Sequence, residues 1–175
     1  MSVSSGFILI DCARSEDLHP ALQAHVRATH ASCRSLFTRR PEAPLEASGP
    51  WLLQTPWDRP VLEPTHWTHR LVHKGVAAWL TSEQGFAEVF EHLHGCVDVA
   101  LPAGTTGMLR FWDPRVFERL QRTLTLDQRI ALIGPVSTWE TCLEGAWSRL
   151  DRDALLKLAS PTDATKEATD ADAEP

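Results

Sequence analysis

The segment Gly107-Met108-Leu109-Arg110-Phe111-Trp112-Asp113-Pro114-Arg115-Val116-Phe117 combines two periodicities in eleven residues. Leu109 and Phe111 alternate with Arg110 and Trp112, which is the period of a half-buried strand. From Asp113 onward the pattern changes, because an Asp can cap the free N–H groups of a helix start, Pro114 suits the first helical position, and Val116 and Phe117 continue at helical spacing. The segment therefore predicts a strand that passes directly into a helix.

Other apolar segments predict further strands. Residues 7–10 and 76–80 are short continuous apolar runs, as expected of strands that are covered on both faces. Residues 51–54 predict a short strand inside a proline-rich, irregular crossing at 38–64. Val97, Val99 and Leu101 alternate with Asp98 and precede a glycine-containing turn at 102–107, which predicts a hairpin that returns through Leu109 and Phe111.

Helix signals lie between these strands. Ser15 is expected to cap a helix through Leu18, Leu22 and Val26. Residues 81–84 and 125–128 both fit a capping box. The first box precedes an apolar helix face of Phe86, Val89, Phe90 and Leu93. The helix after the second ends at Gly134-Pro135, and both residues are expected to have a structural role in that turn.

This order predicts an α/β (α+β) fold, a single domain with a mixed β-sheet flanked by helices. We divide the chain into a domain of residues 1–147, a C-terminal helix of residues 148–160, and a disordered acidic tail of residues 161–175.

Composition excludes several classes of function. The chain has 175 residues, 43% hydrophobic residues and a net charge of -6. Residues 161–175 alone carry -4, so the remainder is nearly neutral and general nucleic-acid binding is not expected. The sequence contains no long apolar run and its first residues do not resemble a secretory signal, so we expect a cytoplasmic protein without a membrane span.

The cysteines and tryptophans are informative as groups. Four single cysteines, without paired spacing, predict reduced thiols rather than a zinc or redox motif. Seven tryptophans accompany no tyrosine. We expect most of these indoles to pack in the core, and some to lie on a contact surface, where tryptophan is enriched.

Histidine spacing raises the possibility of chemistry. His66, His69 and His73 are spaced three and four residues apart and would share a helix face, with His92 or His94 as a further ligand. No Glu accompanies them as in a helical zinc-protease motif, and the chain has no nucleophile elbow or phosphate loop. We therefore predict no catalytic residue, metal site or cofactor, and keep a small metal-dependent hydrolase as an alternative.

The strand-to-helix segment also offers a binding surface. Asp113 and Pro114 are expected to be structural, because an Asp-Pro pair starts many helices. Arg110, Trp112 and Arg115 fit either a structural corner or a partner contact, since arginine and tryptophan are frequent binding hot spots. We predict partner binding through Arg110, Trp112, Arg115 and Trp139.

The segment 110–115, Arg-Phe-Trp-Asp-Pro-Arg, resembles the type VI secretion effector-adaptor family, catalogued as domain of unknown function 4123. Three other segments resemble the same family in the expected order. They are Phe-Ile-Leu-Ile-Asp-Cys-Ala-Arg at residues 7–14, the proline-rich loop that ends in Gly-Pro-Trp-Leu-Leu at residues 49–53, and Leu-Thr-Leu-Asp-Gln to Gly-Pro-Val and Trp at residues 124–139.

The resemblance implies a bacterial chaperone that binds a cognate type VI effector, a toxin, and assists its loading onto the VgrG spike protein. It implies neither an enzyme nor a cofactor. Many family members continue after the Gly-Pro turn into a larger helical lobe, where this chain offers a short helix and a tail. Besides the hydrolase, an immunity-like toxin-binding protein stays open as an alternative.

Overall fold

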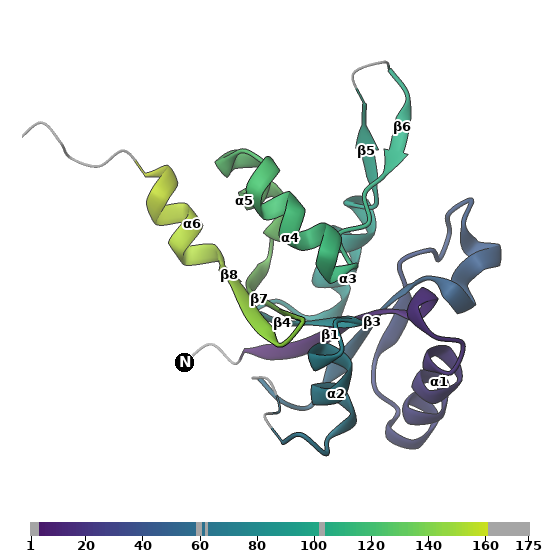
Figure 1. The fold of residues 1–175 in the computed structure, drawn as a ribbon. Coiled ribbons are helices and arrows are strands. Elements are labelled where there is room, and N and C mark those ends of the chain that lie inside the picture. Colours follow the sequence, from purple (N-terminus) through teal and green to yellow (C-terminus); the bar gives the residue numbers. More distant parts are fainter. Residues whose placement is uncertain (1–3, 59–60, 62, 102–103, 161–175) are drawn as a thin grey trace, which may run out of the picture.

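Six strands form the central sheet of the computed structural model, which describes residues 4–58, 61, 63–101 and 104–160. In chain order they are β1 (Ser5–Asp11), β2 (Cys33–Ser35), β3 (Pro50–Thr55), β4 (Ala77–Ser82), β7 (Val136–Leu143) and β8 (Ala146–Asp151). Their spatial order is β2-β3-β1-β4-β7-β8, and every neighbouring pair is antiparallel (Figure 1). Two short strands, β5 (Asp98–Ala100) and β6 (Thr106–Met108), form a separate hairpin.

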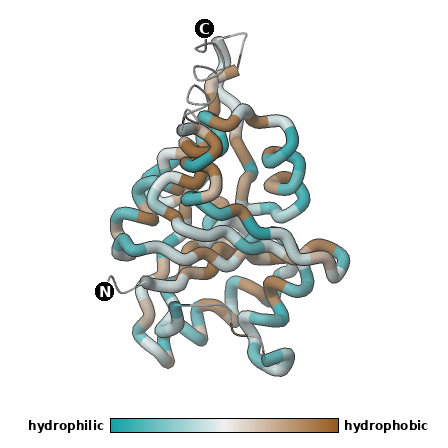
Figure 2. Tube along the Cα trace, turned by 90° about the vertical axis from the view of Figure 1, so that its left-hand side faces the viewer, coloured by the Kyte–Doolittle hydropathy of each residue, from teal (hydrophilic) through white to brown (hydrophobic). Residues whose placement is uncertain are grey.

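Helices cover both faces of this sheet. One face carries α1 (Leu18–Thr29) and α2 (Trp67–His73), and the other carries α3 (Phe86–Gly95), α4 (Pro114–Thr123) and α5 (Leu126–Ile133). The last helix, α6 (Arg152–Ala159), packs beside α5. Short 3-10 helices lie at η1 (Cys12–Arg14) and η2 (Ala43–Ser48). Figure 2 shows the sheet as the middle of three layers.

The central strand β1 explains why the layers hold together. Phe7 and Leu9 belong to the core under α3, α4 and α5, while Ile8 and Ile10 belong to the core against α1 and α2. All four side chains are buried, so both faces of β1 contribute, at about 1.5–3 kcal/mol for each fully buried large apolar side chain. The prediction of a strand covered on both faces is confirmed.

Several other predictions are confirmed. The chain is a single α+β domain with helices flanking the sheet, and the predicted strand at 51–54 is part of β3. Thr125 and Gln128 make both hydrogen bonds of a capping box, and Gly134 ends α5 with a φ of 51°. The hairpin at 97–109 also forms, although it stands apart from the main sheet.

The prediction of a strand that runs directly into α4 is wrong at residues 109–112. Hairpin pairing ends at Leu109, whose N–H donates to the Val97 carbonyl at 2.8 Å. The chain then makes two turns: the Phe111 N–H donates to the Leu109 carbonyl, and the Asp113 N–H donates to the Arg110 carbonyl. The turns bury Phe111 and Trp112 side by side, which the alternation of a strand would not allow.

Two predicted helix caps are also wrong. Thr81 and Ser82 belong to β4, and α3 is capped by Gly85 without a side-chain hydrogen bond. Ser82 instead donates from its Oγ to the Pro135 carbonyl, which fixes the start of β7. Helix α1 begins at Leu18 with Asp17 as the N-cap, so Ser15 lies before the helix.

The C-terminal helix is shorter than predicted. Residues 146–151 form β8, and α6 begins at Arg152 instead of Ser148, capped by Asp151, so the predicted boundary after residue 147 falls inside a strand. Residues 146–151 pair with β7 in a hairpin, whereas the spacing of Leu150, Ala154 and Leu158 is that of a helix. The predicted acidic tail at 161–175 lies outside the described residues. Among the helices that the structure describes, none has the length and apolarity needed to cross a bilayer.

Candidate partner-binding corner

A charged cluster lies where β1 ends and α4 begins. It consists of Asp11, Arg110, Asp113 and Arg115, and we call it the Asp-Arg corner. Both carboxylates are buried, with Asp11 0% and Asp113 2% exposed. Both arginine side chains are about half exposed, at 48% and 50%. The two guanidinium groups are therefore exposed to solvent, and the two carboxylates beneath them are buried.

Asp113 has the structural role that the sequence predicts. Its Oδ1 accepts a hydrogen bond from the backbone N–H of Arg115 at 3.0 Å, which caps α4, and Pro114 occupies the first helical turn. The Arg115 side chain also donates to Asp113, from Nε to Oδ1 at 3.0 Å and from NH2 to Oδ2 at 2.6 Å. This two-point contact fixes the Arg115 guanidinium close to the helix start.

Burial and hydrogen bonding act in opposite directions on Asp113. Burial raises the pKa of its carboxyl, but the hydrogen bonds from the side chain and backbone of Arg115 outweigh it, so the pKa is below its ordinary value. Asp113 is therefore ionised at neutral pH, and its negative charge is neutralised by Arg115.

Asp11 is held differently. Its Oδ1 accepts from the Ala13 N–H at 3.2 Å, which starts η1, while Oδ2 has no hydrogen-bond partner among the described residues. The nearest cation to Oδ2 is the Arg110 guanidinium, 3.7 Å away. Burial raises the pKa of Asp11, and the Ala13 N–H and Arg110 only partly offset it. Asp11 thus depends on Arg110 for compensation of its charge.

Arg110 bridges the two buried acids. Its NH2 lies 3.7 Å from Asp11 Oδ2 and 3.9 Å from Asp113 Oδ2, distances of ionic contact without a direct hydrogen bond. Its donors are therefore largely available to another acceptor. A half-exposed guanidinium with free donors can form hydrogen bonds to carboxylates or main-chain carbonyls.

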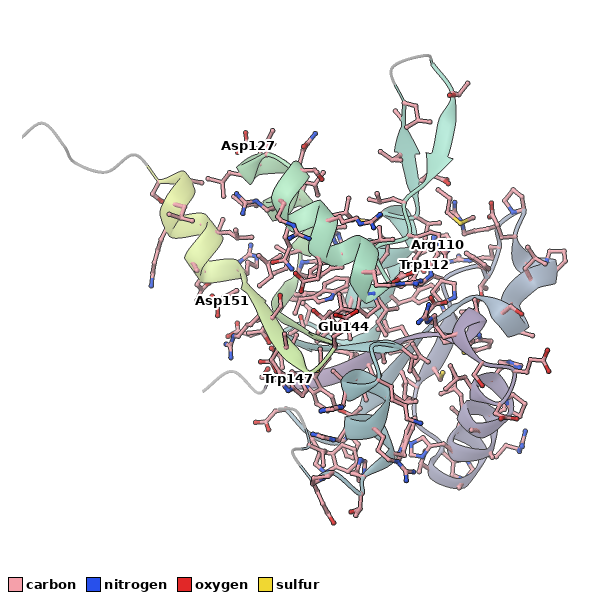
Figure 3. The ribbon with its side chains drawn as sticks, viewed as in Figure 1. Arg110, Trp112, Asp127, Glu144, Trp147 and Asp151 are labelled. Carbon is pink, nitrogen blue, oxygen red and sulfur yellow. The ribbon has the colours of Figure 1, made fainter. Side chains whose placement is uncertain are left out.

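Trp112 and Trp139 do not support the predicted partner contact. Trp112 is 3% exposed and packs edge-on against Phe37 and Phe111. Trp139 is 0% exposed and stacks on Phe117, with 4.5 Å between the ring centroids. Both belong to the core under α4, so neither side chain reaches a partner without opening that core. Figure 3 shows Trp112 next to Arg110 at the start of α4. The two exposed tryptophans are Trp57 and Trp147.

Gly134 has the predicted structural role at the end of α5, and the carbonyl of Pro135 accepts a hydrogen bond from the Ser82 hydroxyl. A Cβ on Gly134 would lie 2.2 Å from the ring of His92, so any other residue here would collide with that ring unless the ring moved. His92 uses its Nε2 in a 2.9 Å contact with the Leu132 carbonyl, and the Gly134 carbonyl accepts from Arg152 Nε at 2.8 Å.

The five histidines whose spacing raised the possibility of a metal site make separate contacts. His66 caps α2, with Nδ1 2.7 Å from the Thr68 hydroxyl, and its ring packs edge-on against Trp57, whereas His69 and His73 stack on each other. His92 and His94 contact backbone carbonyls elsewhere. No group of three or more His, Cys, Asp or Glu side chains with metal-binding geometry occurs within the part of the chain that the structure describes.

The four cysteines are free. Burial raises the pKa of Cys12 to about 12, with a further contribution from Asp11, and burial raises that of Cys33 to about 12 as well. Thiols with such pKa values are protonated at neutral pH and are poor nucleophiles.

Sequence reasoning missed one member of the corner. Asp11 directly follows the apolar run at residues 7–10, and nothing in the local pattern says that it meets Arg110, which lies 99 residues later. An acidic residue that directly follows a continuous apolar strand was the available signal, since such a residue is placed at a sheet end and requires a partner when buried.

The geometry defines an α+β domain whose exposed guanidinium groups suit binding of another molecule. A protein-family model described as "Domain of unknown function (DUF4123)" matches residues 6–131. The chain belongs to this family, and the matched segment contains all four residues of the Asp-Arg corner. No curated protein and no solved structure matches the chain.

Proposed function

We propose that this chain is a cytoplasmic adaptor of bacterial type VI secretion, which binds a cognate effector toxin and assists its loading onto the VgrG spike protein. Two lines support the proposal. The chain belongs to the family that its motifs resemble, and effector delivery is what that resemblance implies. The Asp-Arg corner supplies a preorganised polar surface suited to a protein partner.

The corner is the observation that carries the proposal. Both arginines are half exposed: two side-chain hydrogen bonds to Asp113 hold Arg115, so it needs little further ordering on binding, and Arg110 keeps its donors free beside the two buried carboxylates. Arginines of this kind are common hot spots in protein interfaces. We therefore assign the corner to an acidic or carbonyl-rich segment of the effector.

The physical task of such an adaptor is shielding and docking. Apolar effector surface is covered until delivery, and the complex must form tightly enough for loading and still dissociate at the spike. No bond is made or broken, and the proposal needs no cofactor.

Co-purification tests this function. The tagged chain is expressed in its native host, isolated at moderate salt, and its bound proteins are identified by mass spectrometry. We expect a toxin and VgrG with the native chain and a strong loss of both with Arg110→Ala, Arg115→Ala. The matched control is Arg119→Ala, Arg122→Ala, which removes two exposed arginines from the same helix and should retain both proteins.

Two results would contradict the proposal. Recovery of neither protein from cells that express the secretion apparatus would reject the adaptor function. Inhibition of the purified toxin's activity by the purified chain would favour an immunity protein instead. Circular dichroism of each variant establishes that it is folded, so that lost binding is not confused with lost structure.

A further inference from the structure

Strand β8 leaves one side of the main sheet open. It is the last strand in the spatial order, and among the described residues only β7 pairs with it. It is six residues long, whereas the strand at the opposite edge, β2, has three. An exposed edge of this length is a template for an added strand.

The turn before β8 determines which backbone groups are free. Glu144 and Gly145 have φ values of 53° and 83°, as in a two-residue type I′ turn, so the flanking Leu143 and Ala146 form a hydrogen-bonded pair. Hydrogen-bonded and non-hydrogen-bonded pairs alternate along an antiparallel ladder. The N–H groups of Trp147, Arg149 and Asp151 therefore point away from β7, as do the carbonyls of Trp147 and Arg149.

Side chains beside these free groups form an apolar groove. Trp147 is 44% exposed, and a groove of about 370 Å³ is lined by Glu140, Trp147, Ser148 and Arg149. A free positive charge is a common protection of edge strands. Here Arg149 forms ion pairs with Glu140 at 3.3 Å and with Asp151 at 3.2 Å, so its charge is compensated and gives little protection.

The same edge leads into an acidic cleft. Beyond Asp151, a cleft of about 940 Å³ spans the ends of β4, β7 and β8. Its charged lining residues are Glu83, Glu88, Asp151, Asp153 and Arg152. Arg152, the one cation among them, donates from Nε to the Gly134 carbonyl. Figure 3 shows Trp147 and Asp151 toward opposite ends of β8, so the edge is apolar at one end and acidic at the other.

We propose that the outer edge of β8 binds an extended effector segment as an added strand, with an apolar side chain in the groove beside Trp147 and a basic side chain at the acidic cleft. Trp147 and Asp151 are four residues apart, about 13 Å along a strand, and residues at even spacing share a face. The apolar and basic residues of the bound segment are therefore four positions apart.

This inference rests on the proposed function for the identity of the partner, and charge complementarity selects the segment. Residues 161–175 of the same chain have net charge -4, the wrong sign for the cleft. Two β8 edges paired antiparallel about Arg149 would place Trp147 of one copy opposite Asp151 of the other, so neither copy would bring a basic side chain to the acidic cleft. The edge lies after residue 131, beyond the residues that the family model matches.

Labelled decapeptides test the sequence requirement by fluorescence anisotropy at low salt. The probes carry Leu and Lys four positions apart, in either order, in a threonine-rich background, and the comparison peptides carry Glu in place of Lys. We expect the better Lys peptide to bind about tenfold more tightly than its Glu counterpart, a difference of about 1.4 kcal/mol. Equal affinities, or no binding of either Lys peptide at millimolar concentration, would overturn the proposal.

Protein variants locate the binding site. Trp147→Ala and Asp153→Lys should each lower the affinity for the Lys peptide about fivefold or more, because each removes one apolar or one ionic contact. Trp57→Ala is the control for an exposed tryptophan, and Asp127→Lys for an exposed acid in the first turn of a helix. Both controls should bind normally, and equal weakening by test and control variants would overturn the assignment.

Backbone methylation of the peptide separates strand addition from simple side-chain binding. N-methyl groups on the alternate amides that face β8 should abolish binding, whereas methyl groups shifted by one residue should leave it nearly unchanged. Identical behaviour of the two peptides would reject an added strand. A dimer of the free chain that the Trp147→Ala substitution dissociates, seen by light scattering, would instead make the edge a self-association surface.

The two proposals fail in distinguishable ways. If the peptides bind the β8 edge but no toxin or VgrG co-purifies, the adaptor function is wrong and the edge serves another partner. If toxin and VgrG co-purify equally with the native chain and with Trp147→Ala, Asp153→Lys, the adaptor function stands and the edge is not the effector's binding site.

Discussion

Asp11 and Asp113 lie in the same corner and have opposite pKa shifts, for reasons that the contacts explain. Asp113 receives three hydrogen bonds from Arg115, which stabilise its charged form against burial. Asp11 receives one, from Ala13, and its second oxygen has only the distant Arg110. Burial that few donors offset therefore raises the pKa of Asp11, whereas the donors of Arg115 outweigh burial at Asp113 and lower its pKa.

Loss of the Asp113 cap should destabilise the domain. We expect Asp113→Ala to lower the free energy of unfolding by about 1–2 kcal/mol, because the Arg115 N–H loses its acceptor. Asp113→Asn should cost less, since the amide oxygen can still cap α4. Urea denaturation at pH 7 measures both, with Asp127→Ala as a control that removes an exposed acid without a cap. Unchanged stability of Asp113→Ala together with lost partner binding would reject the capping role and favour a functional one.

Asp11 should make stability depend on pH in the opposite sense to Asp113. A raised pKa in the folded state means that the folded chain holds a proton that the unfolded chain has lost, so the stability from Asp11 is full below its ordinary value of 3.8 and falls as pH rises through the folded pKa. Asp113 has a lowered pKa, so its contribution is present above that value and is lost as pH falls through the folded pKa.

The variant Asp11→Asn isolates the first effect. It keeps an oxygen for the Ala13 N–H and removes the titration, so its stability relative to the native chain should increase from low pH to pH 7. Urea denaturation at several pH values between these limits gives the difference directly. A difference that is constant with pH, or that decreases, would show that Asp11 is not destabilised by burial of its charge.

At the scale of single elements, short patterns predicted what local chemistry controls. The capping box at Thr125–Gln128 and the Asp113-Pro114 helix start formed as expected, because each needs only residues within one turn. The box expected at 81–84 failed because the pairing of β4 with β7 continues to Ser82. Tertiary pairing outweighs a cap worth about 1 kcal/mol.

The missed hairpin of β7 and β8 has a different cause. Its turn places Glu144, not Asn or Asp, at the first left-handed position, so the usual hairpin signal is absent. The spacing of Leu150, Ala154 and Leu158 is that of a single helix, although Leu150 lies in β8 and the other two lie in α6. The prediction that Trp112 contacts a partner is wrong because two consecutive turns bury both Phe111 and Trp112.

Gly134, at the end of α5, lies directly against the His92 side chain of α3. We expect Gly134→Ala to lower the free energy of unfolding by about 3 kcal/mol or more, because a Cβ would collide with the His92 ring and φ is positive. Gly104→Ala is the matched control, with a φ of 75° and nothing within 4 Å of the added carbon, and should cost only about 1–2 kcal/mol. Equal losses in urea denaturation would mean that the His92 ring moves away freely.

At the scale of the whole molecule, the segment that the family model matches and the folded unit differ in extent. The match ends at residue 131, inside α5, whereas β7 pairs with β4 inside the sheet and joins it to β8. Val136, Trp139, Leu150 and Leu155 belong to the same core as Phe7 and Leu9 of the central strand. Residues beyond the match therefore complete the hydrophobic core of the domain.

A chain ended after residue 131 should consequently fail to fold. Loss of Trp139 alone removes a fully buried side chain worth about 3–5 kcal/mol, and domains of this kind are stable by only about 5–15 kcal/mol in total. We expect residues 1–131 to lack a cooperative urea transition and to show poorly dispersed amide resonances, whereas residues 1–160 should retain both. A cooperative transition in the shorter chain would mean that β1, β3 and β4 with their helices fold alone, and that β7 and β8 are an added surface.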